Sequence, residues 1–312
     1  MDGNSLWTIW VSRLVQGLLV VIAVITMVFV VSRVARDPIE YLATDQTTLE
    51  EKEALRAAFG LDDTLYVQYG RFLWETVRLD MGNSFVSGRP ALNDVRDRMG
   101  KTLVLESAAL VFSLAIGLPL GVIAALRRGD PTDWLARLLA VVGQATPNFW
   151  VGLMLIFFFS VELGWLPTGG SGGLKHLILP TFTLSLLTAA SVMRLTRSGM
   201  IDAMAMDFVR TARAKGLHER TIVFRHTLRH ALLPVATILG IEVGRLMAGS
   251  VIVETVFAWP GVGRLLILSI QAGDYPVTQT AILMISSTIV LANIAVDLSY
   301  RFIDPRIRTG AA

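Results

Sequence analysis

The sequence predicts an all-α integral membrane protein with six transmembrane helices. Hydrophobic residues make up 53% of the 312 residues and charged residues only 17%, whereas soluble domains carry about 25% charged residues. Six apolar runs have about the 20-residue length that crosses a bilayer as a helix. If all six cross, the basic pair Arg127 and Arg128, the basic stretch before the fifth run and the basic residues after the sixth fall on one side of the membrane, as cytoplasmic segments do.

The six predicted spans are spread over the whole chain. They cover Leu14–Ser32, Leu103–Leu126, Leu138–Val161, Leu177–Met193, Ala231–Val253 and Tyr275–Val296. The first run is longer than the apolar core of a signal peptide, so it is predicted to be a retained helix. Pro147 predicts a kink inside the third span. A membrane helix tolerates such a kink where neighbouring helices satisfy the backbone groups that the proline leaves free.

Residues 36–100 form the one long polar stretch, between the first and second spans. It carries twelve acidic against eight basic residues. Two helices are predicted in it, Thr48–Phe59, which Gly60 ends, and Tyr66–Arg78. Because basic residues concentrate on the cytoplasmic side, both termini are expected there. Residues 36–100 are then a helical extracytoplasmic insertion.

Asp207–Pro234 is the longest strongly basic stretch, with six lysines and arginines against two acids. Phe208–Lys215 contains good helix formers, and Gly216 predicts the end of this helix because glycine tolerates the left-handed conformation. The spacing of residues from Ile222 onward predicts a second α-helical run before apolar sequence resumes at Pro234. These residues leave two interpretations open: a loop whose charges fix topology, or a docking element for a soluble partner.

The sequence Arg210-Thr-Ala-Arg-Ala-Lys-Gly216, followed by Leu232-Leu-Pro234, resembles the EAA loop of ABC importer permeases. Ala212 and Gly216 match its second alanine and its glycine. Its glutamate and first alanine are replaced, as is usual in the dipeptide/oligopeptide/nickel branch. The resemblance implies that residues 199–230 form a cytoplasmic loop whose coupling helix sits in a cleft of an ATPase subunit. The coupling residues it implies are Arg210, Thr211, Ala212, Lys215, Gly216, Leu217 and Pro234.

Two further segments carry the same resemblance. Residues 254–263, ETVFAWPGVG, resemble the family's segment between the fifth and sixth spans, and residues 304–308, DPRIR, resemble its ending. The resemblance covers nearly the whole chain and implies one permease domain, residues 1–312, with the type I ABC importer fold. It implies the B-type permease subunit of a dipeptide/oligopeptide/nickel importer in the bacterial inner membrane.

The resemblance also implies the partners. A C-type permease subunit would complete a heterodimer that sits in membrane lipid, with two ATPase subunits and an extracytoplasmic solute-binding protein. ATP and Mg would be bound by the ATPase subunits, because this chain has no nucleotide-binding motif. The chain is therefore expected to be a transport subunit rather than an enzyme, with no cofactor, metal, catalytic residue or nucleic-acid partner of its own.

Two charged residues lie deep in the predicted fifth span. Glu242 and Arg245 stand three residues apart on one helix face, and an ionisable residue at such a depth is paired or faces water. They are either a structural ion pair or a polar patch on the solute pathway, and the sequence favours neither. Together with the segment that resembles the family's outer gate region, this gives the expected pathway and gate residues: Glu242, Arg245, Glu254, Trp259, Pro260 and Gly261.

Other functions fit the sequence less well than transport does. An intramembrane serine protease needs a serine nucleophile and a histidine base, and Ser171 with His176 in a short loop is a poor candidate. Residues 169–173, GGSGG, lack the spacing of a phosphate-binding loop and are interpreted as a linker. No filter motif indicates a channel. The expected solutes are dipeptides and oligopeptides, with nickel chelate, glutathione or opine as alternatives.

Overall fold

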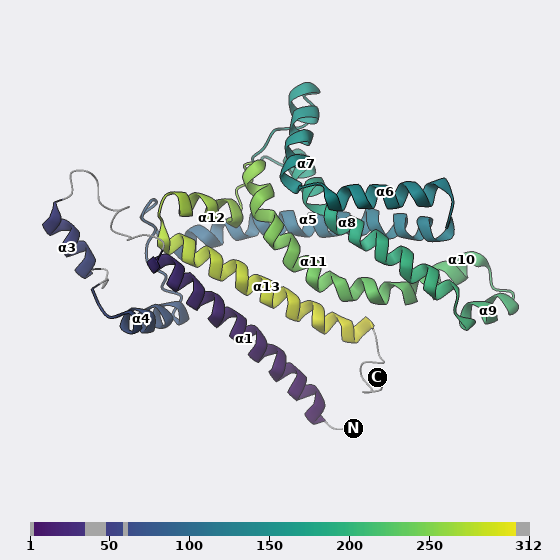
Figure 1. Ribbon diagram of the computed structural model, residues 1–312, viewed down its shortest axis with the longest axis horizontal. Coiled ribbons are helices and arrows are strands. Elements are labelled where there is room, and N and C mark those ends of the chain that lie inside the picture. Colours follow the sequence, from purple (N-terminus) through teal and green to yellow (C-terminus); the bar gives the residue numbers. More distant parts are fainter. Residues whose placement is uncertain (1–2, 35–47, 59–61, 304–312) are drawn as a thin grey trace. The chain divides into compact units, whose positions relative to one another are not determined.

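In the computed structural model, residues 3–34, 48–58 and 62–303 are described, and their regular elements are all helices (Figure 1). The only pairing of extended backbone among them is an isolated bridge between Asn83 and Pro90. The predicted all-α class is therefore confirmed. The chain divides into two compact units, one of Met1–Thr102 with Pro260–Leu291 and one of Leu103–Trp259 with Ala292–Ala312.

The first unit contains the N-terminal helix and the polar stretch that follows it. Its helices are α1 (Gly3–Val34), α3 (Leu49–Ala58), α4 (Leu65–Val77), the first part of α5 (Ala91–Leu126), α12 (Val262–Gln271) and the first part of α13 (Tyr275–Ile303). The two helices predicted in residues 36–100 are thus confirmed as α3 and α4. The predicted stop at Gly60 lies outside the described residues.

Local side-chain bonds explain where α3 begins. The N–H of Thr48 donates to Oε2 of Glu51 at 2.9 Å, and the N–H of Glu51 donates to Oγ1 of Thr48 at 3.3 Å. This reciprocal pair is a capping box, which satisfies two of the backbone donors that a helix start leaves free.

Aromatic contacts fix α4 against α1. The ring of Phe29 lies 5.2 Å from that of Tyr69 and 5.6 Å from that of Phe72, and the hydroxyls of Thr26 and Tyr69 are 2.7 Å apart. The side chain of Ser84 donates to Asp274, just before α13, and the N–H of Phe85 donates to the same carboxylate. The end of the polar stretch is thereby fastened within the first unit.

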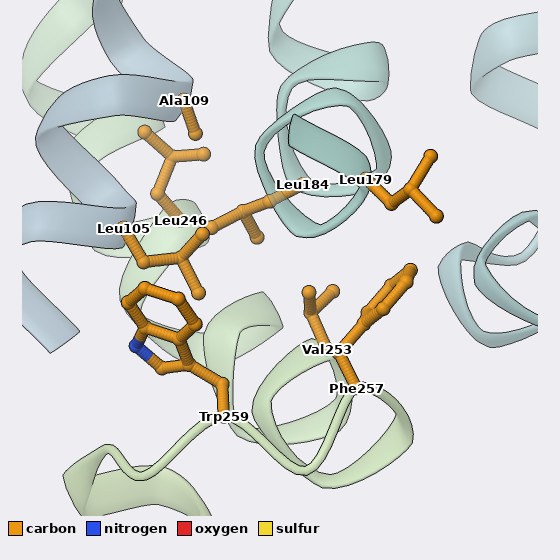
Figure 2. Close-up of a cluster of buried hydrophobic side chains, with 8 residues drawn as sticks. All are labelled: Leu105, Ala109, Leu179, Leu184, Leu246, Val253, Phe257 and Trp259. Carbon is orange, nitrogen blue, oxygen red and sulfur yellow. The ribbon is translucent and has the colours of Figure 1, made fainter. Parts of the chain in front are cut away.

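The second unit holds the central helices of the chain. They are the rest of α5, α6 (Pro131–Ala145), α7 (Asn148–Leu155), η1 (Ile156–Glu162), α8 (Leu174–Met204), α9 (Asp207–Ala214), α10 (Glu219–Thr221), η2 (Ile222–Thr227) and α11 (Leu228–Val256). Side chains from α5, α8 and α11 meet in one buried apolar cluster (Figure 2). Its members are Leu105, Ala109, Leu179, Leu184, Leu246, Val253, Phe257 and Trp259.

Two glycines one helical turn apart let α5 approach α8 closely. A Cβ on Gly117 would lie 2.8 Å from the carbonyl oxygen of Ala189, and a Cβ on Gly121 would lie 2.6 Å from the Cβ of Thr196. Neither distance is possible between real atoms. Small residues four apart are the usual means by which membrane helices bring their backbones together.

Among the described residues, four helical runs are each long and apolar enough to cross a membrane: Ala91–Leu126, Leu174–Met204, Glu219–Val256 and Tyr275–Val296. They contain the second, fourth, fifth and sixth predicted spans. The first predicted span lies in α1, where the described apolar segment is Val15–Val31.

The third predicted span is not one kinked helix. The helices Pro131–Ala145 and Asn148–Glu162 meet at an angle of 104°, so the prediction of a simple kink at Pro147 is wrong. The reason lies in the preceding residue. Thr146 has φ −89° and ψ 127°, the extended conformation that a following proline favours. The helix therefore ends, and a new one starts after Pro147.

The run after Gly216 also differs from its prediction. Residues Ile222–Thr227 form a π-helical turn rather than an α-helix. Ile222 and Val223 are both buried, and they pack in two different apolar clusters. The hydroxyl of Thr227 donates to the carbonyl of Ile222 at 3.0 Å. The π-helical turn therefore follows from the packing of two adjacent residues in different clusters. The spacing of residues in the sequence does not encode such packing.

Candidate functional site

The basic segment forms a short helix and a glycine turn between α8 and α11. Helix α9 ends at Ala214, with Lys215 as its C-cap, and Gly216 has φ +72°. The N–H of Gly216 donates to Arg213 O at 2.9 Å and that of Leu217 to Ala212 O at 3.2 Å, which satisfies carbonyls at the helix end. The predicted helix and its stop at Gly216 are confirmed. In Figure 1, α9 and α10 lie together at one end of α8 and α11.

Contacts and backbone conformation within this chain explain why positions 212 and 216 carry small residues. Ala212 is only 7% exposed and packs with Val209 and Ile222, so its small size suits internal packing. Gly216 is exposed, and no atom of this chain lies within 4 Å of a Cβ built on it, so within the chain glycine is needed there for its backbone conformation.

Exposed residues beside Ala212 and Gly216 form a basic surface. Arg210, Thr211, Lys215 and Leu217 are all exposed. Pro234, the last residue of the predicted coupling set, lies inside α11 and is also exposed.

An ion pair ties the two arms of the turn together. Nε of Arg213 lies 2.7 Å from a carboxylate oxygen of Glu219 in α10. The hydrogen bond that Arg213 donates to this carboxylate raises the pKa of the guanidinium above its usual value. The pair holds α9 against α10 while leaving Arg210 and Lys215 free of contact with Glu219.

The charged pair in the fifth span has a defined geometry. Glu242 is fully buried, and its Oε1 accepts a hydrogen bond from Nη1 of Arg245 at 3.0 Å. Its Oε2 accepts another from Oγ1 of Thr188, in α8, at 2.9 Å. Both carboxylate oxygens are therefore bonded, which offsets the burial of a charge. The spacing of Glu242 and Arg245 predicted their pairing. It gave no sign of Thr188, which lies 54 residues before Glu242 in the sequence.

Arg245 lies on an exposed stripe that follows α11. The stripe consists of every exposed residue from position 234 to 256, at spacings of three and four: Pro234, Thr237, Ile241, Arg245, Ala248, Ile252 and Thr255. The opposite side of the helix packs into the second unit through residues such as Val235, Leu246 and Val253. One face of α11 is therefore available to solute, water or a partner subunit.

The expected gate residues divide between the two units. In the second unit, Glu254 and Trp259 are buried, and the N–H of Trp259 donates to Glu254 O at 2.8 Å. The indole lies beside Leu105 in the apolar cluster of Figure 2. Pro260 begins the first unit, where Gly261 precedes α12.

The glycines of residues 169–173 are more than a linker. The N–H of Gly170 donates to the carbonyl of Phe257 at 2.9 Å. A Cβ on Gly169 would lie 2.2 Å from that same oxygen, so only glycine fits. Ala258, which follows Phe257, has a φ of +48°. This loop therefore closes over the end of α11 just before Trp259.

Three other features of the second unit concern charge or chemistry. Glu106 is buried in α5, and its Oε1 has no hydrogen-bond partner in the described part of the chain. Asp133 and Arg197 form a bidentate ion pair that the sequence analysis missed. The buried Nδ1 of His176 has no hydrogen-bond partner within the described ranges. The Ser171–His176 pair of the protease alternative is therefore not formed at that nitrogen.

These features define a multi-pass membrane permease: apolar helices long enough to span, an exposed basic segment between two of them, and bonded charges inside one. Residues 117–309 match the family of the binding-protein-dependent transport system inner membrane component. The glutathione transport system permease protein GsiC of Escherichia coli (strain K12) is 41% identical over 290 residues, 93% of this chain and 94% of that protein. The GsiC protein of Salmonella paratyphi A is 39% identical over the same shares.

A solved structure shares the fold. An inward-facing conformation of the MetNI methionine ABC transporter matches with a TM-score of 0.57 and 21% identity, over 67% of this chain and 96% of that one. The chain belongs to the binding-protein-dependent transport system inner membrane component family. It is an inner-membrane permease of an ABC importer, as its motifs predicted, and a transport component rather than an enzyme. ATPase and solute-binding protein partners follow from that membership.

Proposed function

We propose that this chain is the B-type permease subunit of an ATP-driven importer of short peptides, and that its solute is glutathione or a similar tripeptide. The observation that carries the proposal is the 41% identity to GsiC, a glutathione transport permease, over 93% of this chain. This relationship favours the glutathione alternative over the broader class of dipeptides and oligopeptides.

In the proposed assembly, this chain pairs with a C-type permease subunit, and two ATPase subunits bind from the cytoplasm. Both termini and residues 199–230 lie on the cytoplasmic side. Residues 36–100, with α3 and α4, form the extracytoplasmic insertion and face the solute-binding protein. The basic character of residues 207–234 and the acidic character of residues 36–100 support this orientation.

Helix α9 is the proposed coupling element. Its exposed Arg210, Thr211 and Lys215, with Leu217 beyond the turn, would contact a cleft of the ATPase subunit. Ala212 and Gly216 would maintain the shape of the turn rather than touch the partner. When ATP closes the ATPase pair, α9 moves with it, and the helices switch between inward-facing and outward-facing states.

The proposed pathway follows the exposed stripe of α11. Arg245 supplies a charge halfway along it, and the buried Glu242 holds that charge in place. Glu254, Trp259, Pro260 and Gly261 contribute to the outer gate. The buried hydrogen bonds around Glu254 and the loop at Gly169 support a gate that is held in a defined shape.

The test is uptake into proteoliposomes that contain the complete transporter and its binding protein. Labelled glutathione should enter when ATP is inside with the ATPase subunits, and a non-hydrolysable analogue should not support entry. Dipeptide, nickel chelate and opine serve as competitors at equal concentration. Faster ATP-dependent uptake of any of these than of glutathione would contradict the proposed solute. Uptake that does not depend on ATP would contradict the whole proposal.

A further inference from the structure

The guanidinium of Arg245 is held at one edge. Its Nη1 bonds Oε1 of Glu242 at 3.0 Å, and the other oxygen of that carboxylate is bonded by Thr188 at 2.9 Å. Glu242 is fully buried, so its carboxylate cannot turn toward another partner. The arginine head group is thus fixed in position by two helices, α8 and α11.

The other edge of the guanidinium has no protein partner in the described part of the chain. The Arg245 side chain is 46% exposed. Among the described residues, its hydrogen bond and its ion pair are one and the same contact, with Glu242. A guanidinium has five N–H donors in a planar fork that suits two parallel bonds to a carboxylate. Most of these donors remain available on the exposed face of α11.

The position of Arg245 limits what it can face. It lies near the middle of the predicted fifth span, Ala231–Val253, where a charged side chain exposed to lipid is strongly unfavourable. The adjacent residues on the stripe are Ile241 and Ala248. The half-exposed charge of Arg245, rather than the apolar character of its neighbours, therefore requires water or protein instead of lipid against this part of α11.

We infer that Arg245 is a specificity-determining residue, which binds a carboxylate group of the solute as the solute passes α11. This inference rests on the proposed function, since it requires a peptide-like solute on the α11 face. A peptide with a free C-terminus offers the planar carboxylate that the fork matches. Glu242 is the positioning residue, because it fixes the guanidinium without meeting the solute.

The experiment compares a free-acid tripeptide with its C-terminal amide in proteoliposomes that hold the complete transporter. The main variant is Glu242→Gln/Arg245→Gln, which removes the guanidinium without leaving a buried carboxylate unpaired. Arg245→Lys keeps the charge but loses the fork. Arg137→Gln, which removes a half-exposed arginine on α6, is the matched control. The ratio of variant to wild-type uptake for each peptide cancels any preference of the binding protein.

The double variant should raise the KM for the free acid about tenfold, since a bond to a charged group is lost. The KM for the amide should change by less than about twofold, and Arg245→Lys should lie between the two. Equal changes for acid and amide would overturn the inference and would instead indicate that Arg245 binds a carboxylate of the partner permease. An unchanged KM for both peptides would also overturn it. If wild type transports neither peptide nor glutathione, the proposed function itself fails.

Discussion

Arg197 of α8 binds both carboxylate oxygens of Asp133 in α6, with Nε at 2.6 Å from Oδ1 and Nη2 at 2.9 Å from Oδ2. Asp133 is 1% exposed and Arg197 20%. The backbone N–H of Gly129 also donates to this carboxylate at 3.1 Å. The pair joins the first helix of the bent third span to α8, across a sequence separation of 64 residues.

Asp133→Asn should destabilise the protein by about 3–5 kcal/mol, because it leaves the Arg197 charge without its partner in a mostly buried site. The measurement is the melting temperature of the purified protein in detergent. Arg137→Gln is the control, since Arg137 is 53% exposed and 3.6 Å from the same carboxylate, and its loss should cost less than about 1 kcal/mol. Equal melting temperatures for the two variants would contradict this role of Arg197.

Gly121→Leu should prevent α5 from packing on α8, because even a Cβ at that position would overlap Thr196 and the Met193 carbonyl. We expect low yield of folded protein on size-exclusion chromatography. Gly100→Leu in the same helix should be tolerated, since a Cβ there meets no atom within 4 Å. Similar yields of the two variants would show that the close approach is unnecessary.

Gly216→Glu should leave the protein in the membrane but separate ATP hydrolysis from uptake, because the side chain is strained at φ +72° and the turn presents α9. A residue other than glycine is disfavoured there by about 1–2 kcal/mol, and asparagine less so. Gly216→Asn should therefore keep coupling. ATPase activity and uptake are measured in the same proteoliposomes. Wild-type uptake by Gly216→Glu would rule out the coupling role of this turn.

Single cysteines give a direct test of topology, because the chain has none of its own. A membrane-impermeant maleimide should label Thr64→Cys in intact spheroplasts and Ala214→Cys only after permeabilisation. Both positions are exposed, so burial does not prevent labelling. The cysteine-free parent is the blank. Labelling of Thr64→Cys from the cytoplasmic side alone is incompatible with six spans and an outer insertion.

Glu242→Gln and Arg245→Gln form a double-mutant cycle. Arg245→Gln alone leaves a buried carboxylate without its cation and should reduce membrane expression most, since such a loss costs about 3–5 kcal/mol. The double variant should be expressed better than Arg245→Gln. Each variant that is expressed at wild-type level should also change uptake kinetics if the pair lies on the pathway. Additive effects on expression would mean that the two charges do not interact.

Local signals in the sequence were enough for most of the fold. Apolar length located the long helices, and the acidic start of Thr48–Phe59 located α3. Gly216 located the end of α9. Each of these depends on residues within one or two turns of each other, so the sequence shows them directly. The family motifs added the coupling segment and the gate segment, which no periodicity could identify.

Features that depend on distant partners were not predictable. Pro147 predicted only a kink within one span, because the size of the 104° bend after Thr146 also depends on what α7 packs against. The π-turn at Ile222–Thr227 depends on two separate clusters. Thr188 gave no signal as the partner of Glu242, and Arg197 gave none as the partner of Asp133. Gly169 looked like a linker residue because its fit against Phe257 is visible only in three dimensions.

The helical run Glu219–Val256 is 38 residues long, and it joins the end of the basic turn to the start of the proposed gate segment. At 1.5 Å per residue its length is at most about 57 Å, so each degree of tilt at one end moves the other by up to about 1 Å. The run therefore amplifies a tilt at its first residues. A small rotation at an interface that tilts α10 by a few degrees would displace the Val256 end by about the width of a water molecule or more.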